Sequence, residues 1–263
     1  LKQSLKIIIL YTMLTFIIFI LFKLINLRTF DAYNFSLTII SSGGFLSVNN
    51  FDNLFLTDLS KIILSLTILF SYFSLFFSYN LIFLHKKNIN YLSEDFYLLI
   101  YLLIVISFIF VFFNHENNFL SILVSIISSV SNLGISFTNT PENLSFIFLI
   151  LVIIGGSFFS TSSGLRVIKV LSLIKFSINN LLSNSKPNQI YLNKITLSSS
   201  STNKDDINKY FLTIIIFIIS LFTITLLLTI SNIDLENSFK IGILTLMNTV
   251  NSSMYGVNEF DFY

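Results

Sequence analysis

Two short glycine-containing stretches of this chain could line an ion pathway with their backbone. They are Ser41–Phe45 (SSGGF) and Ser131–Ile135 (SNLGI), and about ninety residues separate them. Each stretch follows a long hydrophobic segment and a short polar loop, and each precedes a second hydrophobic segment. Exposed backbone is tolerated at membrane depth only where it faces water or an ion, whose hydration shell the carbonyl groups can replace. The pattern therefore predicts part of a cation channel or transporter.

The composition indicates that these stretches belong to an integral membrane protein. Of the residues, 54% are hydrophobic and 11% are charged, with a mean hydropathy of +0.84. Soluble chains carry about 25% charged residues. Several apolar runs approach or exceed the roughly 20 residues that cross a bilayer core. These runs are Ile7–Ile25, Ile62–Leu84, Phe96–Phe113, Leu144–Phe176 and Phe211–Ile230.

The sequence offers no catalytic constellation. It contains no cysteine, which excludes thiolate metal sites and cysteine nucleophiles. In the predicted topology His85 and His115 lie on opposite faces of the membrane, so they cannot share a site. There is no phosphate-binding glycine loop, and a net charge of +2 does not favour nucleic-acid binding. We expect a protein that is not an enzyme and that binds neither a cofactor nor nucleic acid.

Half-length helices are predicted to position the glycine stretches. The segments 31–40, 119–130 and 235–250 are too short, or too polar at their ends, to span a bilayer. Asp31 and Asp234 lie near two of their starts, where a carboxylate can pair with free N–H groups. The carboxyl ends of such helices would present partial negative charge to a cation. Amphipathic helices lying in the membrane interface are the alternative.

The hydrophobic run Leu144–Phe176 contains an interruption. Residues 155–164 hold three glycines and five Ser or Thr residues, a composition that breaks helices. An unwound loop at this depth is plausible only if it faces a cavity. We therefore predict a movable loop beneath the filter, beginning at Gly155 and Gly156 and ending at Gly164. Arg166 and Lys169 follow at once, and we expect them to anchor the helix at the cytoplasmic interface.

The distribution of charge predicts the orientation of the chain. Most lysines and arginines fall in 1–6, 85–95 and 166–210, whereas the opposite loops are acidic. The positive-inside rule places the basic side in the cytoplasm. An acidic outer face would also concentrate cations, although polar loops require charges in any case.

Three stretches resemble the Trk/Ktr/HKT superfamily of potassium transporters, specifically the TrkH-type membrane subunit of bacterial uptake systems. Phe30-Asp31-Ala32 with the following Ile40–Phe45 is similar to that family's F-D-A and S-T-G-G-F motifs. Residues 154–169 resemble the G-G…S-T…G-x-K-V motif of the third repeat. Residues 248–256 fall where the fourth filter, N-x-G-P-G, would lie. The resemblance covers essentially the whole chain in order.

The resemblance implies an all-α integral membrane fold of repeated M1–P-loop–M2 units around a central pore. Residues 1–88 would form the second repeat and 89–180 the third, with its intramembrane gate loop. A cytoplasmic connector would occupy 181–206, and 207–263 would supply only M1 and the P-loop of the fourth repeat, as an internal piece of a longer protein. The resemblance also implies K⁺ as the transported ion, a cytosolic nucleotide-binding regulatory subunit, a homodimer and a bacterial cytoplasmic (inner) membrane.

The sequence departs from the family pattern in the fourth filter. Ser253 stands where a filter glycine is expected, and Met254 where proline is usual. The alternative is therefore a degenerate, non-transporting paralogue, or one that selects less strictly between K⁺ and Na⁺. The predicted ion-binding residues are Ser41, Ser42, Gly43, Gly44, Phe45, Asn132, Leu133, Gly134, Ile135, Asn251, Ser252 and Ser253.

Overall fold

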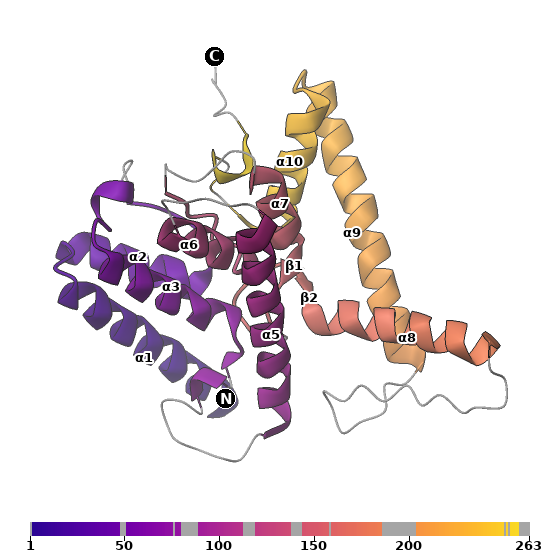
Figure 1. Cartoon of the computed structure of the whole chain (residues 1–263), viewed down its shortest axis with the longest axis horizontal. Helices are drawn as coiled ribbons and strands as arrows, with labels where there is room; N and C mark the ends of the chain where they lie inside the picture. Colours follow the sequence, from indigo (N-terminus) through magenta and orange to yellow (C-terminus); the bar gives the residue numbers. More distant parts are fainter. Residues whose placement is uncertain are drawn as a thin grey trace.

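The structure, a computed structural model, is a helical assembly in which long and short helices alternate. It describes residues 2–47, 51–75, 77–79, 89–112, 119–137, 144–157, 159–185, 204–249, 251 and 253–257. In these residues three successive units each begin with a long helix that is followed by a helix of about half its length (Figure 1).

The first unit consists of α1 (Lys2–Leu24), α2 (Thr29–Ser41) and α3 (Asp58–Tyr72). The 13 residues of α2 extend about 20 Å, well short of a bilayer core of about 30 Å. The chain turns between α1 and α2 at Asn26, whose φ of 63° is left-handed, and α2 packs against α1. After a short 3₁₀ helix, η1 (Phe51–Asn53), the Thr57 hydroxyl accepts a hydrogen bond from Ser60 N and begins α3.

The second unit contains the predicted interruption. It begins with α5 (Ile89–Phe112), α6 (Phe119–Val130) and α7 (Ser145–Ile153). Two short parallel strands, β1 (Ile154–Gly155) and β2 (Leu165–Arg166), then enclose a non-helical loop, and α8 follows. The helix α8 (Val167–Ser185) runs away from α7 across the view in Figure 1.

The third unit repeats the beginning of the first. The long helix α9 (Lys204–Ile230) turns at Asn232, with a φ of 65°, into the short helix α10 (Leu235–Leu246). The turn at Asn26 has an equivalent backbone hydrogen bond. Leu27 N donates to Phe22 O at that turn, and Ile233 N donates to Leu228 O at the turn of the third unit. A short 3₁₀ helix, η3 (Ser253–Tyr255), is the last element described in this unit.

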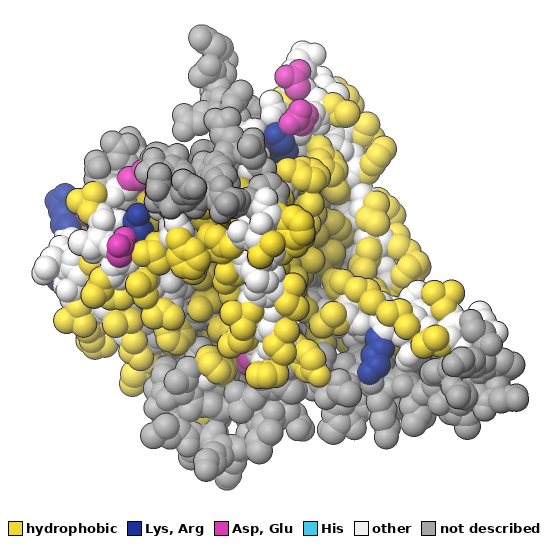
Figure 2. Space-filling view, in the orientation of Figure 1, with side chains coloured by type: hydrophobic (Ala, Val, Ile, Leu, Met, Phe, Trp, Pro, Cys, Tyr) yellow, Lys and Arg dark blue, Asp and Glu magenta, His cyan; other side chains and the backbone are white. Residues whose placement is uncertain are grey.

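Three helices of the described chain are long and apolar enough to cross a membrane. They contain the windows Ser4–Leu24, Glu94–Phe112 and Ile207–Ile230. Only 6% of the last window is fully buried within the described protein, where α9 packs along α10. Figure 2 shows the resulting apolar surface, with charged side chains confined mostly to the ends of the helices.

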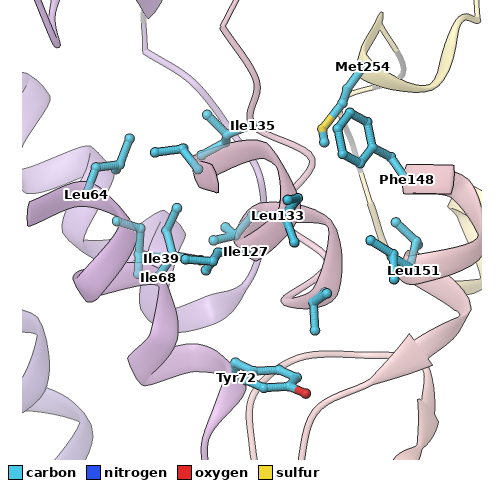
Figure 3. Packing of buried hydrophobic residues seen from close by; sticks show 14 of the residues in the cluster. Ile39, Leu64, Ile68, Tyr72, Ile127, Leu133, Ile135, Phe148, Leu151 and Met254 are labelled. Carbon is cyan, nitrogen blue, oxygen red and sulfur yellow. The ribbon is translucent and has the colours of Figure 1, made fainter. Parts of the chain in front are cut away.

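The half-helix α6 lies in the interior of the molecule. Every side chain from Val124 to Val130 is buried, and Ile127 packs with Leu133, Ile39 and Ile68 in the core cluster (Figure 3). A helix lying in the membrane interface would expose one face, so the interfacial alternative is wrong for α6. The serine side chains of this helix face other parts of the protein. A helix that ends inside a membrane needs such surroundings, because only protein groups can hydrogen-bond its terminal N–H and C=O groups there.

We predict that Phe35→Ala will destabilise the first unit by about 3–5 kcal/mol, the usual cost of truncating a buried aromatic side chain. Phe35 is fully buried and meets Phe22 and Phe55 edge to face at 6.3 and 5.8 Å between ring centroids. Thermal unfolding in detergent, followed by circular dichroism, measures the loss. Phe30→Ala is the matched control, because Phe30 lies on the same helix and is exposed. Equal effects of the two changes would contradict the packing described here.

Candidate functional site

The three half-helices end with the same backbone geometry. A residue just beyond each end is left-handed: Ser42 has a φ of 51°, Asn132 of 63° and Asn248 of 55°. In all three, the next amide returns to a carbonyl of the last helical turn, which is the Schellman motif. The three ends are therefore equivalent. The bonds are Gly43 N to Thr38 O at 3.0 Å, Leu133 N to Ser128 O at 2.9 Å and Thr249 N to Leu244 O at 2.9 Å.

This geometry establishes which residues of the three stretches correspond. Two residues after the left-handed residue, Gly44 and Gly134 are themselves left-handed, with φ values of 69° and 70°. The same count from Asn248 reaches Val250, which is outside the described residues. Ser253 lies further along, in η3. In this register the expected match of Ser253 to the filter glycines is wrong, because α10 ends earlier than the segment predicted to extend to residue 250.

Gly134 brings the second stretch against the third. A Cβ atom at Gly134 would lie 2.7 Å from Thr249 Cγ2 and 3.1 Å from the carbonyl oxygen of Asn251. The left-handed φ would strain any other residue as well. Only glycine therefore permits both the turn of the second stretch and its close approach to the third.

Asn251 connects the third stretch to the first. Its side-chain Nδ2 donates a hydrogen bond to the carbonyl oxygen of Gly44 at 3.2 Å. In the register of the helix ends Asn251 corresponds to Phe45 and Ile135; the predicted neighbour Ser252 lies outside the described residues. The structure thus brings the first, second and third stretches together, and ion binding by their carbonyls remains a proposal.

Hydroxyl groups on two half-helices hold the residues that follow the glycines. Thr38 Oγ1 donates to the carbonyl oxygen of Phe45 at 2.8 Å. At the equivalent helical position, Ser128 Oγ accepts a hydrogen bond from Ile135 N at 2.6 Å. The third half-helix has Leu244 at this position, so its stretch lacks this tether.

The acidic residues at the starts of the half-helices do not cap them with their side chains. Neither α2 nor α10 has a side-chain hydrogen bond at its N-cap, so the expected capping by Asp31 and Asp234 is wrong. Asp31 instead accepts a hydrogen bond from the Ser47 hydroxyl at 2.9 Å, which ties the chain beyond the first stretch back to α2. Lys240 Nζ does the same for the third unit, donating to the carbonyl oxygen of Gly256 at 3.2 Å.

The predicted interruption of the long hydrophobic run is present. We call residues 156–164 the intramembrane loop. Its neck is the parallel strand pair, in which Ile154 lies opposite Leu165 and Gly155 opposite Arg166. A Cβ at Gly156 would lie 2.3 Å from the carbonyl oxygen of Tyr72, so the loop passes directly against the end of α3.

Backbone hydrogen bonds attach the intramembrane loop to the end of α3. Ser157 N donates to Tyr72 O at 3.2 Å and Ser162 N to Ser71 O at 3.2 Å. In the reverse direction, Leu75 N donates to Phe159 O at 3.1 Å. The unwound backbone of the loop is thus paired with unwound backbone of another helix, as the membrane interior requires.

Arg166 holds the loop from inside. Its guanidinium donates to Ser157 O at 2.9 Å, to Ser162 O at 2.8 Å and to the Ser160 hydroxyl at 2.8 Å. Arg166, which the sequence-based prediction placed with the gate-loop residues and at the cytoplasmic interface, thus uses its guanidinium to satisfy loop carbonyls.

The other side of the loop contacts the half-helix ends. Thr161 Oγ1 lies 3.3 Å from Ser42 Oγ, and Ser163 Oγ donates to the carbonyl oxygen of Met247 at the end of α10. Asn132 Nδ2 donates at 2.8 Å to the carbonyl oxygen of Val152, just before the loop. An open recess of about 550 Å³ reaches this region, and Ser41 and Thr161 are among its lining residues. The loop therefore lies next to the carboxyl ends of the half-helices.

Two parts of this site are absent from the residues predicted from the sequence. Asn248 and Thr249 lie in the range 248–256 where the fourth filter was expected, but the predicted ion-binding residues began at Asn251. A signal was present, since Asn248 precedes Val250 by the spacing that separates Asn132 from Gly134. The second omission is the end of α3, which receives the loop. No glycine or proline marks it.

Comparison with known proteins supports the fold. The chain is similar to the crystal structure of the potassium transporter TrkH from Vibrio parahaemolyticus, with a TM-score of 0.80 and 19% sequence identity. The match covers 94% of this chain and 55% of that one, so the chain spans about half the length of that transporter. No family model and no curated protein matches the sequence. The predicted all-helical, TrkH-like membrane fold is confirmed.

We predict that Gly134→Ala will destabilise the protein, because strain at a left-handed position costs about 1–3 kcal/mol and the contact with Thr249 adds to it. Thr249→Ser removes the Cγ2 atom that the new Cβ would meet. The double variant should therefore recover part of the loss but not all of it. Thermal unfolding in detergent measures the effect, with Thr249→Ser alone as the control. No loss in Gly134→Ala would contradict the geometry.

We also predict that Arg166→Gln will loosen the intramembrane loop, because a shorter, uncharged amide cannot make the same set of bonds to loop carbonyls. Hydrogen exchange at Ser157 N and Ser162 N should become at least tenfold faster, while exchange within α6 stays unchanged. Lys169→Gln is the matched control on the next helix. Equal acceleration in both variants would show that Arg166 does not hold the loop.

Proposed function

We propose that this chain is the ion-conducting part of a TrkH-type potassium transporter. The observation that carries the proposal is the convergence of three equivalent half-helix ends on one intramembrane loop. The structural similarity also supports it, since the crystal structure that this chain resembles is that of a potassium transporter.

The chemistry follows from the half-helix ends. A helix carboxyl terminus carries partial negative charge, and carbonyl groups beyond it can replace the water around K⁺. Rigid carbonyls suit this task, and the hydroxyl tethers of Thr38 and Ser128 provide rigidity. We propose that the filter consists of Ser41–Phe45, Asn132–Ile135 and residues 248–251. In the third stretch, Asn251 was already predicted from the sequence, and residues 248–250 are added because they follow the end of α10 in the same register.

The intramembrane loop is proposed as the gate. It contacts the ends of α2 and α10 through Thr161 and Ser163, so its displacement would open the region beside them. Its pairing is mainly by hydrogen bonds from the backbone and from Arg166, which can be exchanged for water in an open pore. A cytosolic nucleotide-binding subunit, a homodimer and a bacterial cytoplasmic membrane are the proposed regulator, assembly and location, and they rest on the family resemblance.

A less selective transporter is the second candidate, and a specific observation favours it. The position equivalent to Gly44 and Gly134 is Val250, and a β-branched residue adopts left-handed angles only at considerable cost. The hydroxyl tether is also missing at Leu244. A filter with one irregular segment would hold its carbonyls less uniformly and would discriminate less between K⁺ and Na⁺.

The test is cation influx into proteoliposomes that contain the complete transporter. We expect K⁺ influx well above that of empty vesicles, and growth of cells that lack their own potassium uptake on low external K⁺. Correctly folded, membrane-inserted protein that carries neither K⁺ nor Na⁺ would overturn the proposal in favour of a non-transporting paralogue.

Val250→Gly should improve selectivity by restoring the residue found at the equivalent positions. We expect a several-fold rise in the ratio of K⁺ to Na⁺ influx. Gly44→Val, which places the irregular residue in the first stretch, should lower that ratio. If Val250→Gly leaves the ratio unchanged, the helix-end register does not describe the filter.

A further inference from the structure

A buried carboxylate, Asp95, lies in a membrane-length helix and has no part in the proposed filter. Its side chain is only 3% exposed, and it belongs to α5 within the apolar window Glu94–Phe112. A buried ionisable residue is costly unless polar groups pair with it, and in a membrane protein it marks a functional purpose. Its hydrogen-bond partners indicate that purpose.

Both oxygens of Asp95 bind one residue, Ser74. Oδ1 accepts from the backbone N–H of Ser74 at 2.9 Å, and Oδ2 accepts from its hydroxyl at 2.6 Å. Ser74 lies where α3 breaks, just after Phe73, which is extended at φ −76° and ψ 165°. An N–H group at a break inside the membrane needs a partner, and Asp95 provides it across 21 residues of sequence.

Ser74 also begins the next helical turn. Its hydroxyl accepts a hydrogen bond from Phe77 N at 3.0 Å, and its carbonyl accepts one from Ser78 N at 3.2 Å. Asp95 therefore fixes the hydroxyl that caps the resumed helix. The carboxylate determines the shape of the break on both of its sides.

The intramembrane loop is attached to the residues that flank Ser74. Tyr72 O receives the amide of Ser157 on one side, and Leu75 N donates to Phe159 O on the other. Ser71 O accepts from both Ser162 N and Thr161 Oγ1. The break in α3 is thus the dock of the loop, and its backbone must keep one shape for these bonds to form together.

We propose that Asp95 is a positioning residue for the gate: by holding Ser74, it keeps the break of α3 in the shape to which the intramembrane loop binds. This inference rests on the proposed function, because it assumes that the loop closes the pore. Asp95 and Arg166 then stabilise the closed loop in two ways, one by shaping its dock and the other by filling its interior. Loss of Asp95 favours the open state by weakening only the closed one.

The experiment compares variants of the complete transporter in proteoliposomes. In Asp95→Ala, which removes both acceptors, we expect basal K⁺ influx to rise several-fold and exchange at Leu75, Ser157 and Ser162 amides to become at least tenfold faster. Asp95→Asn keeps the shape and one acceptor, so its effect should be intermediate. Ser107→Ala is the matched control, because Ser107 lies on the same helix and its exposed hydroxyl bonds only Ile104 O.

Each outcome decides the matter. A merely structural Asp95 would lower the thermal midpoint and the influx together, with faster exchange throughout the protein, and that result overturns the inference. Unchanged influx in Asp95→Ala, with a conducting wild type, overturns it while leaving the proposed function intact. If neither the wild type nor any variant conducts K⁺, the proposed function fails. Faster hydrogen exchange in Asp95→Ala at only the amides of Leu75, Ser157 and Ser162 would still show that Asp95 positions the loop. If Asp95→Ala does not fold, Ser74→Ala and Asp95→Asn should each give the same direction of change and should not add.

Discussion

Within a bilayer there is no water to satisfy a broken helix, so every unwound backbone group of this chain must find a partner in the protein. The intramembrane loop and the break after Tyr72 solve this problem for one another. Ser157 and Ser162 donate to the end of α3, and Leu75 donates back to the loop. Two charged side chains bind backbone groups that these bonds leave unpaired: Arg166 binds the carbonyl oxygen of Ser157, and Asp95 binds the amide of Ser74. The non-helical segments are therefore interdependent, and movement of one requires replacement of bonds in the other.

The same constraint explains the half-helices. A helix that stops inside the membrane leaves free carbonyl groups, and the Schellman turns at Ser42, Asn132 and Asn248 satisfy some of them and direct the chain onward. The stretches that follow then lie against each other, through Gly134 with Thr249 and through Asn251 with Gly44. Carbonyl groups that converge in such a place can replace the water around a dehydrated cation.

Features with a local cause could be predicted from the sequence. The segment 119–130 matches α6, because its length and flanking polar residues limit it, and the loop at 155–164 follows from clustered glycine and serine. Features with a distant cause could not. The break after Tyr72 lies in an apolar run without glycine or proline, and it depends on Asp95 in another helix. Arg166 resembled an interface anchor because the carbonyls it binds come together only in the folded loop.

We propose that the three stretches together bind a monovalent cation. Thallium, which resembles K⁺ in size and charge and scatters anomalously, tests it directly in crystals of the complete transporter. We expect an anomalous peak within coordination distance of carbonyl oxygens near Gly44, Gly134 and Asn251, and we expect this peak to disappear when K⁺ is added in excess. If the half-helices have the arrangement described here but thallium binds only elsewhere in the crystal, the three stretches are not a cation site.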